Sequence, residues 1–231
     1  QVTAGQGRIG QFTFLMLMFF LMIVGIIYVE QGQRRIPIQF AKRVRGRKVM
    51  GGQSTYIPLK VNSAGVIPVI FATSILFFPA LVATSLPQDN SVTAAIRNWI
   101  DVNLANSQGT TWFYIFFLGI LIIFFTYFYT TIQFDPVRQS DMIRRQGGFV
   151  PGVRPGISTT NYLSHIINRI TLPGSIFLAS VAVLPSIASA IWDIPLGFSG
   201  ISILITVGVA LETMKQIESQ LSMRNYEGFI D

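Results

Sequence analysis

The sequence predicts an all-α polytopic membrane protein with five transmembrane helices. Hydrophobic residues make up 51% of the 231-residue chain and charged residues only 12%, about half the charged fraction of a typical soluble domain. Five long apolar runs follow one another along the chain. The basic residues between them are concentrated in two alternate connecting segments.

Each apolar run is long enough to cross a bilayer, because about 20 helical residues at 1.5 Å per residue span a hydrocarbon core of roughly 30 Å. The last run is the weakest, since glycine and serine dilute its start. Pro68 and Pro79 in the second run, like Pro173 and Pro185 in the fourth, favour irregular helices packed against one another. The predicted transmembrane helices are residues 11–29, 63–86, 111–134, 170–192 and 198–215.

The segments that connect these runs differ sharply in charge. Of the 17 basic residues, eight lie in residues 30–62 and five in 135–169, whereas 87–110 contains only Arg97. The positive-inside rule therefore puts the two basic segments in the cytoplasm, the amino end outside and the carboxyl end inside. The expected topology is an extracytoplasmic lead-in (1–10), a cytoplasmic basic loop (30–62), an extracytoplasmic loop (87–110), a second cytoplasmic basic loop (135–169), an extracytoplasmic turn (193–197) and a cytoplasmic tail (216–231). Within the loop 87–110 we expect a short amphipathic helix around 94–104.

The residue content argues against catalysis. The chain has no cysteine and His165 is its single histidine, so neither a thiolate site nor a histidine-rich metal site is expected. The interiors of the spans offer no charged side chain for a proton relay or an intramembrane acid. A G-x-G-x-x-G pattern at Gly5–Gly10 lacks the preceding strand that a dinucleotide site requires. We therefore expect no enzyme activity, cofactor or metal site.

Two basic stretches allow two interpretations each. Residues Arg34–Lys48 interleave cations with apolar side chains, and the glycines that follow suit a protruding hairpin. Such charge can merely hold a loop in the cytoplasm near anionic lipid, or it can dock RNA or an acidic protein surface. In the second loop, the Pro-Gly pairs at 151–152 and 155–156 predict two type II turns that present Arg154 between them. A rigidly presented arginine favours the docking interpretation.

Four distinctive stretches run from one end of the chain to the other: RRIPIQFAKR, GGQSTYIPLKVNSAGVIPVIFA, GGFVPGVRPG and MRNYEGF. Together they resemble the SecY family, the large subunit of the bacterial protein-conducting channel. The resemblance covers spans six to ten and implies the carboxy-terminal half of a pseudo-symmetric ten-helix channel. It also implies a passive pore in the bacterial plasma membrane, which passes unfolded secretory polypeptides and signal sequences and releases membrane helices sideways into the lipid bilayer.

The resemblance implies roles for residues in the second and fifth spans. Ile70 and Ile205 match positions of the family's apolar pore ring, where bulky side chains resist wetting yet deform around a passing chain. The second span would also line a lateral gate, with residues at four-residue spacing on one helix face. These gate residues are Asn62, Val66, Ile70, Ser74 and Phe78. Ordinary packing against helices or lipid is the alternative for each of them.

The resemblance also implies partners. The amino-terminal half of SecY would complete the pore, with the small membrane subunits SecE and SecG. The SecA motor or the ribosome, through rRNA and proteins, would dock on the basic loops. The expected docking residues are Arg34, Arg35, Lys42, Arg43, Arg45, Arg47, Lys48, Arg144, Arg145 and Arg154. Two other classes remain: half of a secondary transporter, disfavoured by the lack of intramembrane charge, and a membrane scaffold whose basic loops bind only lipid.

Overall fold

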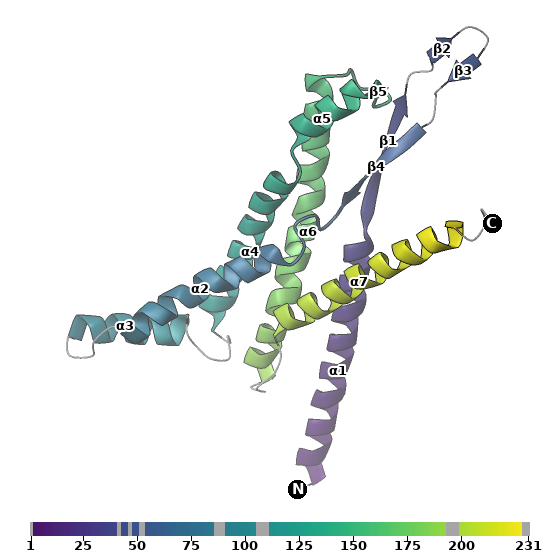
Figure 1. The fold of residues 1–231 in the computed structure, drawn as a ribbon. Coiled ribbons are helices and arrows are strands. Elements are labelled where there is room, and N and C mark those ends of the chain that lie inside the picture. The colour runs from purple at the N-terminus through teal and green to yellow at the C-terminus, as the bar shows by residue number, and fades with distance from the viewer. Residues whose placement is uncertain are drawn as a thin grey trace.

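The computed structural model describes residues 2–40, 43–45, 48–50, 54–85, 91–104, 111–192 and 199–227. Within these ranges, five helices are long and apolar enough to cross a membrane (Figure 1). They are α1 (Val2–Gln31), α2 (Ile67–Ser85), α4 (Trp112–Gln133), α6 (Ile157–Trp192) and α7 (Gly200–Glu227). The expected class, a mostly helical multi-pass membrane protein with five spans, is confirmed.

Several helices extend beyond the predicted spans. Helix α1 begins at Val2, inside the expected lead-in, and α6 begins at Ile157, well before the predicted start at residue 170. Helix α7 continues past residue 215 to Glu227. Hydropathy marks only the hydrocarbon layer, whereas a helix continues into water until its backbone hydrogen bonding is interrupted.

Helix α6 forms the centre of the membrane region and is its most buried span. It packs against α1, α2, α4 and α7. Leu118 and Ile122 of α4, Leu178 of α6 and Leu204 of α7 are almost completely buried in the shared core. Small residues of α6, such as Ala179 and Ala182, belong to the same core and allow neighbouring helices to approach closely, which stabilises helix pairs in lipid.

The first basic loop forms a long hairpin outside the span region (Figure 1). Strand β1 (Gln33–Phe40) pairs antiparallel with β4 (Ser54–Lys60), and the short strands β2 (Arg43–Arg45) and β3 (Lys48–Met50) pair with each other towards the hairpin tip. Side chains on β1 alternate, so that Ile36 and Ile38 are buried and their neighbours are exposed. This alternation is typical of a strand with one face on a core.

A second, smaller core attaches this hairpin to the helices. Helix α5 (Pro136–Arg145) is N-capped by Asp135, whose carboxylate accepts hydrogen bonds from the backbone N–H groups of Val137 and Arg138 at 2.9 and 3.3 Å. It packs against the start of α6. The buried side chains of this core are Ile36, Ile38, Leu59, Ile143, Val150, Leu163 and Ile166. They join the hairpin, α5 and α6 into one unit.

Helix α3 (Ser91–Asn103) lies between α2 and α4 in the sequence and corresponds to the expected amphipathic helix around 94–104. It packs on α2. Arg97 and Asp101 form an ion pair of 3.7 Å along one of its faces. In Figure 1 it lies at the end of α2 that is far from the hairpin.

Candidate functional site

The two basic loops meet in one three-stranded sheet. Strand β5 (Gly148–Phe149) adds to the free edge of β1, with Gln39 opposite Phe149 and Phe40 opposite Gly148. A Cβ atom at Gly148 would lie 3.0 Å from Cγ2 of Ile38 and 3.1 Å from Cε1 of Phe40. A larger residue at this position would force neighbouring side chains to shift where the second loop approaches the first. The two loops form a single surface, although the paired strand residues are more than a hundred positions apart in the sequence.

Arg154 is held between two fixed turns, as its Pro-Gly neighbours predict. The N–H of Val153 donates to the carbonyl of Val150 at 3.1 Å, and Gly152 between them has φ +82°. Such a positive φ is the requirement of a type II turn. On the other side, the hydroxyl of Thr159 donates to the carbonyl of Arg154 at 3.0 Å. The backbone is therefore fixed, while the arginine side chain is exposed.

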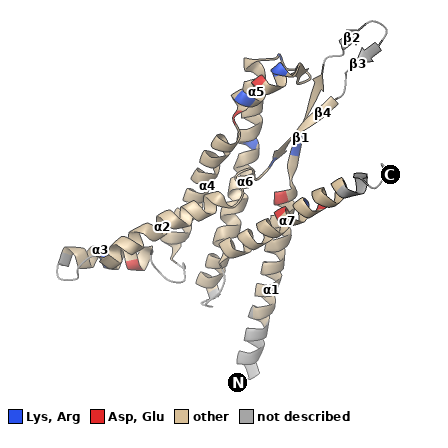
Figure 2. Cartoon of the chain, viewed as in Figure 1, with Lys and Arg blue, Asp and Glu red and all other residues tan. Residues whose placement is uncertain are grey.

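Other candidate docking residues lie on this surface. Arg34 and Arg35 are exposed on β1, and Arg144 and Arg145 are exposed in the last turn of α5 (Figure 2). The guanidinium of Arg35 lies 4.8 Å from the ring centre of Tyr56, which orients its planar group through a cation–π contact. The backbones of Arg43, Arg45 and Lys48 belong to β2 and β3, whereas Lys42 and Arg47 lie outside the described residues.

The candidate pore residue Ile70 lies in the first turn of α2 and is 42% exposed. Ser74 and Phe78 follow it at four-residue spacing and are also exposed, Phe78 by 66%. The hydroxyl of Ser74 donates to the carbonyl of Ile70 at 2.8 Å, so the polar atom is satisfied within the helix. Val66 directly precedes α2, and its carbonyl accepts the N–H of Ile70 at 3.3 Å. These four residues continue one helical row.

Asn62 does not belong to that row, and the expectation that it shares the face is wrong. Helix α2 begins at Ile67, and Gly65 before it has φ +64°. A left-handed residue interrupts the helix, so the four-residue spacing cannot be extended back to Asn62. The Asn62 side chain is instead 4% exposed and donates to Oε2 of Glu30 at 3.0 Å.

The second pore candidate, Ile205, lies near the start of α7 and is partly exposed. The start of α2 approaches α7 at this level, because a Cβ atom at Gly208 would lie 3.7 Å from Cγ1 of Val66. The two helices run in opposite directions across the span region (Figure 1). Ile70 lies about one helical turn after Val66 on α2, and Ile205 lies about one turn before Gly208 on α7, both on the side away from the basic hairpin. The two isoleucines are therefore at a similar depth.

Asn62 and Glu30 form a polar joint between the hairpin and the spans, which the sequence analysis missed. The N–H of Val61 donates to the carbonyl of Gly32 at 3.0 Å, and a Cβ atom at Gly174 in α6 would lie 2.7 Å from the carbonyl oxygen of Val61. The residues that follow α1 and β4 are thus hydrogen-bonded to each other, and Val61 packs closely against Gly174 of α6. A signal was available, because Glu30 is the single acidic residue in the segment 30–62.

We expect Asn62→Asp to destabilise the protein, because the substitution places a second carboxylate next to the carboxylate of Glu30. Losing the hydrogen bond and bringing like charges together should lower the free energy of unfolding by about 1–3 kcal/mol. The loss is measured as a lower temperature of thermal unfolding in detergent. Adding Glu30→Gln should restore most of the loss, because the new amide can donate to the carboxylate introduced opposite it. Failure of the double variant to recover would show that the two side chains do not interact.

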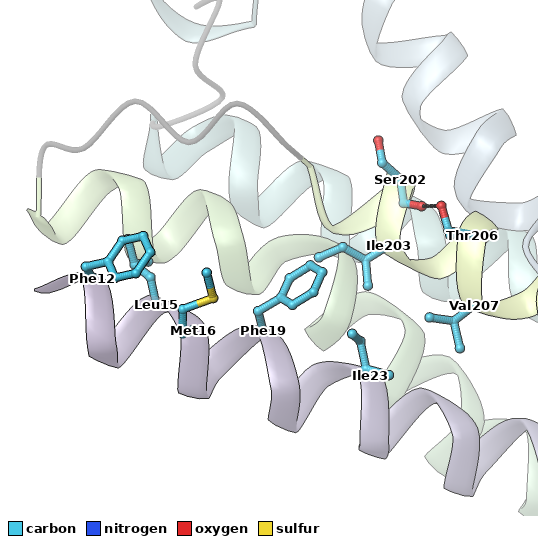
Figure 3. A pocket seen from close by; sticks show the side chains of 9 residues that line it. All are labelled: Phe12, Leu15, Met16, Phe19, Ile23, Ser202, Ile203, Thr206 and Val207. Carbon is cyan, nitrogen blue, oxygen red and sulfur yellow. Dashed lines mark hydrogen bonds between the residues drawn. The ribbon is translucent and has the colours of Figure 1, made fainter.

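An apolar groove of about 460 Å³ lies between α1 and α7 (Figure 3). Its lining residues are Phe12, Leu15, Met16, Phe19, Ile23, Ser202, Ile203, Thr206 and Val207. The hydroxyl of Thr206 donates to the carbonyl of Ser202 in its own helix at 2.8 Å. The groove therefore offers almost only apolar contacts. Among the described residues, no group of three His, Asp or Glu side chains could hold a metal ion.

These features define a multi-pass helical membrane protein with a basic extramembrane sheet and an uncovered, mainly apolar row on one span. A sequence profile of the SecY family matches residues 1–214, and the chain belongs to that family. It is 51% identical over 216 residues to the protein translocase subunit SecY of Streptomyces scabiei, covering 91% of this chain and 47% of that protein. It is 49% identical over 218 residues to SecY of Mycobacterium tuberculosis H37Rv, covering 91% and 48%.

Solved structures share the fold. One, described as showing that the SecY plug domain stabilises the closed state of the translocation channel, has a TM-score of 0.53 at 15% identity and covers 88% of this chain and 49% of its own. Another, described as the structure of a protein-conducting channel, has a TM-score of 0.52 at 16% identity and covers 87% and 47%. The chain thus spans about half the length of the curated relatives it matches.

Proposed function

We propose that this chain supplies the carboxy-terminal half of a protein-conducting channel in the bacterial plasma membrane. The channel passes unfolded secretory polypeptides across the membrane and releases membrane helices through a lateral gate. It is a passive pore and not an enzyme, with the work supplied by the SecA motor or by a translating ribosome. Family membership and the half-length match to translocase subunits support this proposal.

The observation that carries the proposal is the uncovered row on α2. Ile70, Ser74 and Phe78 are exposed on a span, and Ile70 lies at a similar depth to Ile205 on α7. In the complete channel this row faces the amino-terminal half across the pore and the lateral gate. Bulky isoleucines at the constriction exclude water and ions, yet their side chains can move aside for an extended polypeptide.

The surface that joins the two basic loops is the docking site for the energy source. It gathers Arg34, Arg35, Arg144, Arg145 and Arg154 beside a strand pairing that ties both loops together. Exposed guanidinium groups suit phosphate or carboxylate partners, which ribosomal RNA and acidic protein surfaces provide. The positive charge also orients this end towards the cytoplasm. SecE and SecG are proposed as the small membrane partners of the completed complex.

A secondary transporter is not favoured, because the curated relatives are protein translocase subunits. A scaffold that binds only lipid would leave the row on α2 without a role. The channel and the scaffold differ in what contacts Ile70 and Phe78 during activity.

Site-specific photo-crosslinking tests the proposal. A photoreactive amino acid is introduced at position 70, 78 or 205 of the full-length protein, and a secretory chain is stalled in transit through the reconstituted complex. We expect adducts with the stalled chain at these three positions. Phe124 of α4 is the matched control, because it is 61% exposed, close to the 66% of Phe78. Adducts of equal yield at position 124, or only with lipid at position 70, would contradict the proposal.

A further inference from the structure

Helix α3 carries an exposed apolar face that the proposed channel does not use. Its side chains divide into three sectors around the helix. Thr93, Arg97, Ile100 and Leu104 are half-buried on the side that faces the protein. Asn98 and Asp101 are exposed and polar. The third sector is mainly exposed and apolar, with Val92 at 68%, Ile96 at 48%, Trp99 at 52% and Val102 at 64%. Its one polar member, Asn103, is half-buried, and its amide donates to the carbonyl of Trp99 at 2.9 Å.

Both ends of α3 are fixed at the same membrane surface, opposite the basic loops. Helix α2 ends at Ser85, a few residues before α3 begins at Ser91. At the other end, the carbonyl of Val102 accepts a hydrogen bond of 2.9 Å from the hydroxyl of Thr111, directly before α4. Since α2 ends and α4 starts at this surface, α3 runs along it and does not cross the membrane.

The exposed face of α3 continues into an exposed apolar surface of α4. The indole ring of Trp99 contacts the ring of Phe113 edge to face, with centroids 5.6 Å apart. Trp112 and Phe116 of α4 are 64% and 69% exposed on a membrane span. The apolar surface of the span therefore extends without interruption onto α3.

The tryptophans of the chain mark this level as a membrane–water interface. The chain has three: Trp99 in α3, Trp112 at the first position of α4 and Trp192 at the last position of α6. Tryptophan is enriched at the headgroup level, because its ring is apolar and its N–H is polar. None of the three lies at the end of a span that leads into a basic loop.

We propose that α3 is an interfacial helix that binds the lipid surface opposite the basic loops, with Val92, Ile96, Trp99 and Val102 inserted at the boundary of headgroups and acyl chains. Lipid is the occupant that fits, because the face continues an exposed apolar surface of the span α4 at the end marked by tryptophan. The basic residue of α3, Arg97, forms an ion pair with Asp101. The attraction of α3 to the bilayer is therefore hydrophobic and does not require anionic lipid. Because α3 packs on α2, this binding holds the far end of the span that carries Ile70.

Spin labels on the two exposed sectors test the inference. The chain has no cysteine, so a cysteine at position 96, 102 or 98 gives a unique label within it. The full-length protein, with any cysteine in its remaining part replaced, is reconstituted in vesicles of neutral phosphatidylcholine, with or without anionic phosphatidylglycerol. Power saturation then compares collisions with oxygen, which enters the bilayer, and with a water-soluble nickel chelate.

We expect the ratio of oxygen to nickel accessibility to be at least about threefold higher at positions 96 and 102 than at position 98, because polar reagents are excluded from the acyl region. The ratio should be the same in both kinds of vesicle. Labels at 96 and 102 that both reagents reach poorly would show that protein covers the face. Labels at 96 and 102 that the nickel chelate reaches as readily as the label at position 98 would show that this face of α3 faces water. Either result overturns the proposal.

Discussion

Arg154→Glu is expected to abolish the transport of a secretory reporter while leaving the amount of protein in the membrane unchanged. The side chain is exposed, so reversing its charge removes no internal contact. Placing like charges opposite each other at an interface costs several kcal/mol, and about 2 kcal/mol already corresponds to a loss of about 30-fold in affinity. Transport into reconstituted vesicles and binding of the motor or ribosome should fall together.

The fixed backbone of Arg154 explains why geometry should matter in addition to charge. The turn bond from Val153 to Val150 and the hydroxyl of Thr159 hold the residue from both sides. A guanidinium carried on a backbone fixed in this way can present two parallel donors to one partner group, which lysine cannot do. Arg154→Lys should therefore retain only part of the transport activity.

Arg138→Glu is the matched control for this experiment. Arg138 is also exposed, in the neighbouring helix α5, and its replacement changes the net charge by the same amount. Equal loss of transport in the two variants would show that only the overall charge of the loop matters. A parallel loss of protein from the membrane would indicate a role for Arg154 in folding.

Local patterns in the sequence predict those features whose physical cause is local. The five spans follow from the thickness of the bilayer and the absence of charge, and the turns around Arg154 follow from the dihedral preferences of proline and glycine. Gly152 and Gly156, with φ of +82° and +108°, both adopt the expected positive values. Hydropathy could not predict how far α1, α6 and α7 extend beyond the membrane. Hydropathy falls at the membrane surface, whereas the backbone hydrogen bonding of a helix can continue into water.

Features that depend on distant segments were missed. The two-residue strand β5 carries no periodicity of its own, so its pairing with β1 appears only when α5 and α6 are in position. The four-residue spacing of the gate residues that the resemblance implies puts Asn62 on the same helix face as Val66 and Ile70. The left-handed Gly65 ends that pattern and directs Asn62 towards Glu30. A buried polar side chain required a partner, and the lone acid at position 30 was the available signal.

Replacing Ile70 and Ile205 together by asparagine is expected to make the resting channel leak. Both side chains are at least partly exposed in this half, so the change should affect stability little. Asparagine side chains at the constriction would hydrogen-bond water and remove the dewetted barrier to ions. A reduction of that barrier by about 1.4 kcal/mol raises the rate of ion passage tenfold. We expect at least this increase in ion release from vesicles that contain the full-length complex.

Ile75→Asn separates a pore effect from the general effect of a polar residue in a span. Ile75 lies on the same helix and is 44% exposed, against 42% for Ile70, but the helical repeat puts it about 140° around the helix axis from Ile70. Its replacement should leave the leak near the wild-type level. If the double variant stays tight, or if Ile75→Asn leaks as much, the constriction is not formed by Ile70 and Ile205. Leakage confined to the double variant would instead assign the seal to Ile70 and Ile205, because only these two side chains would have changed.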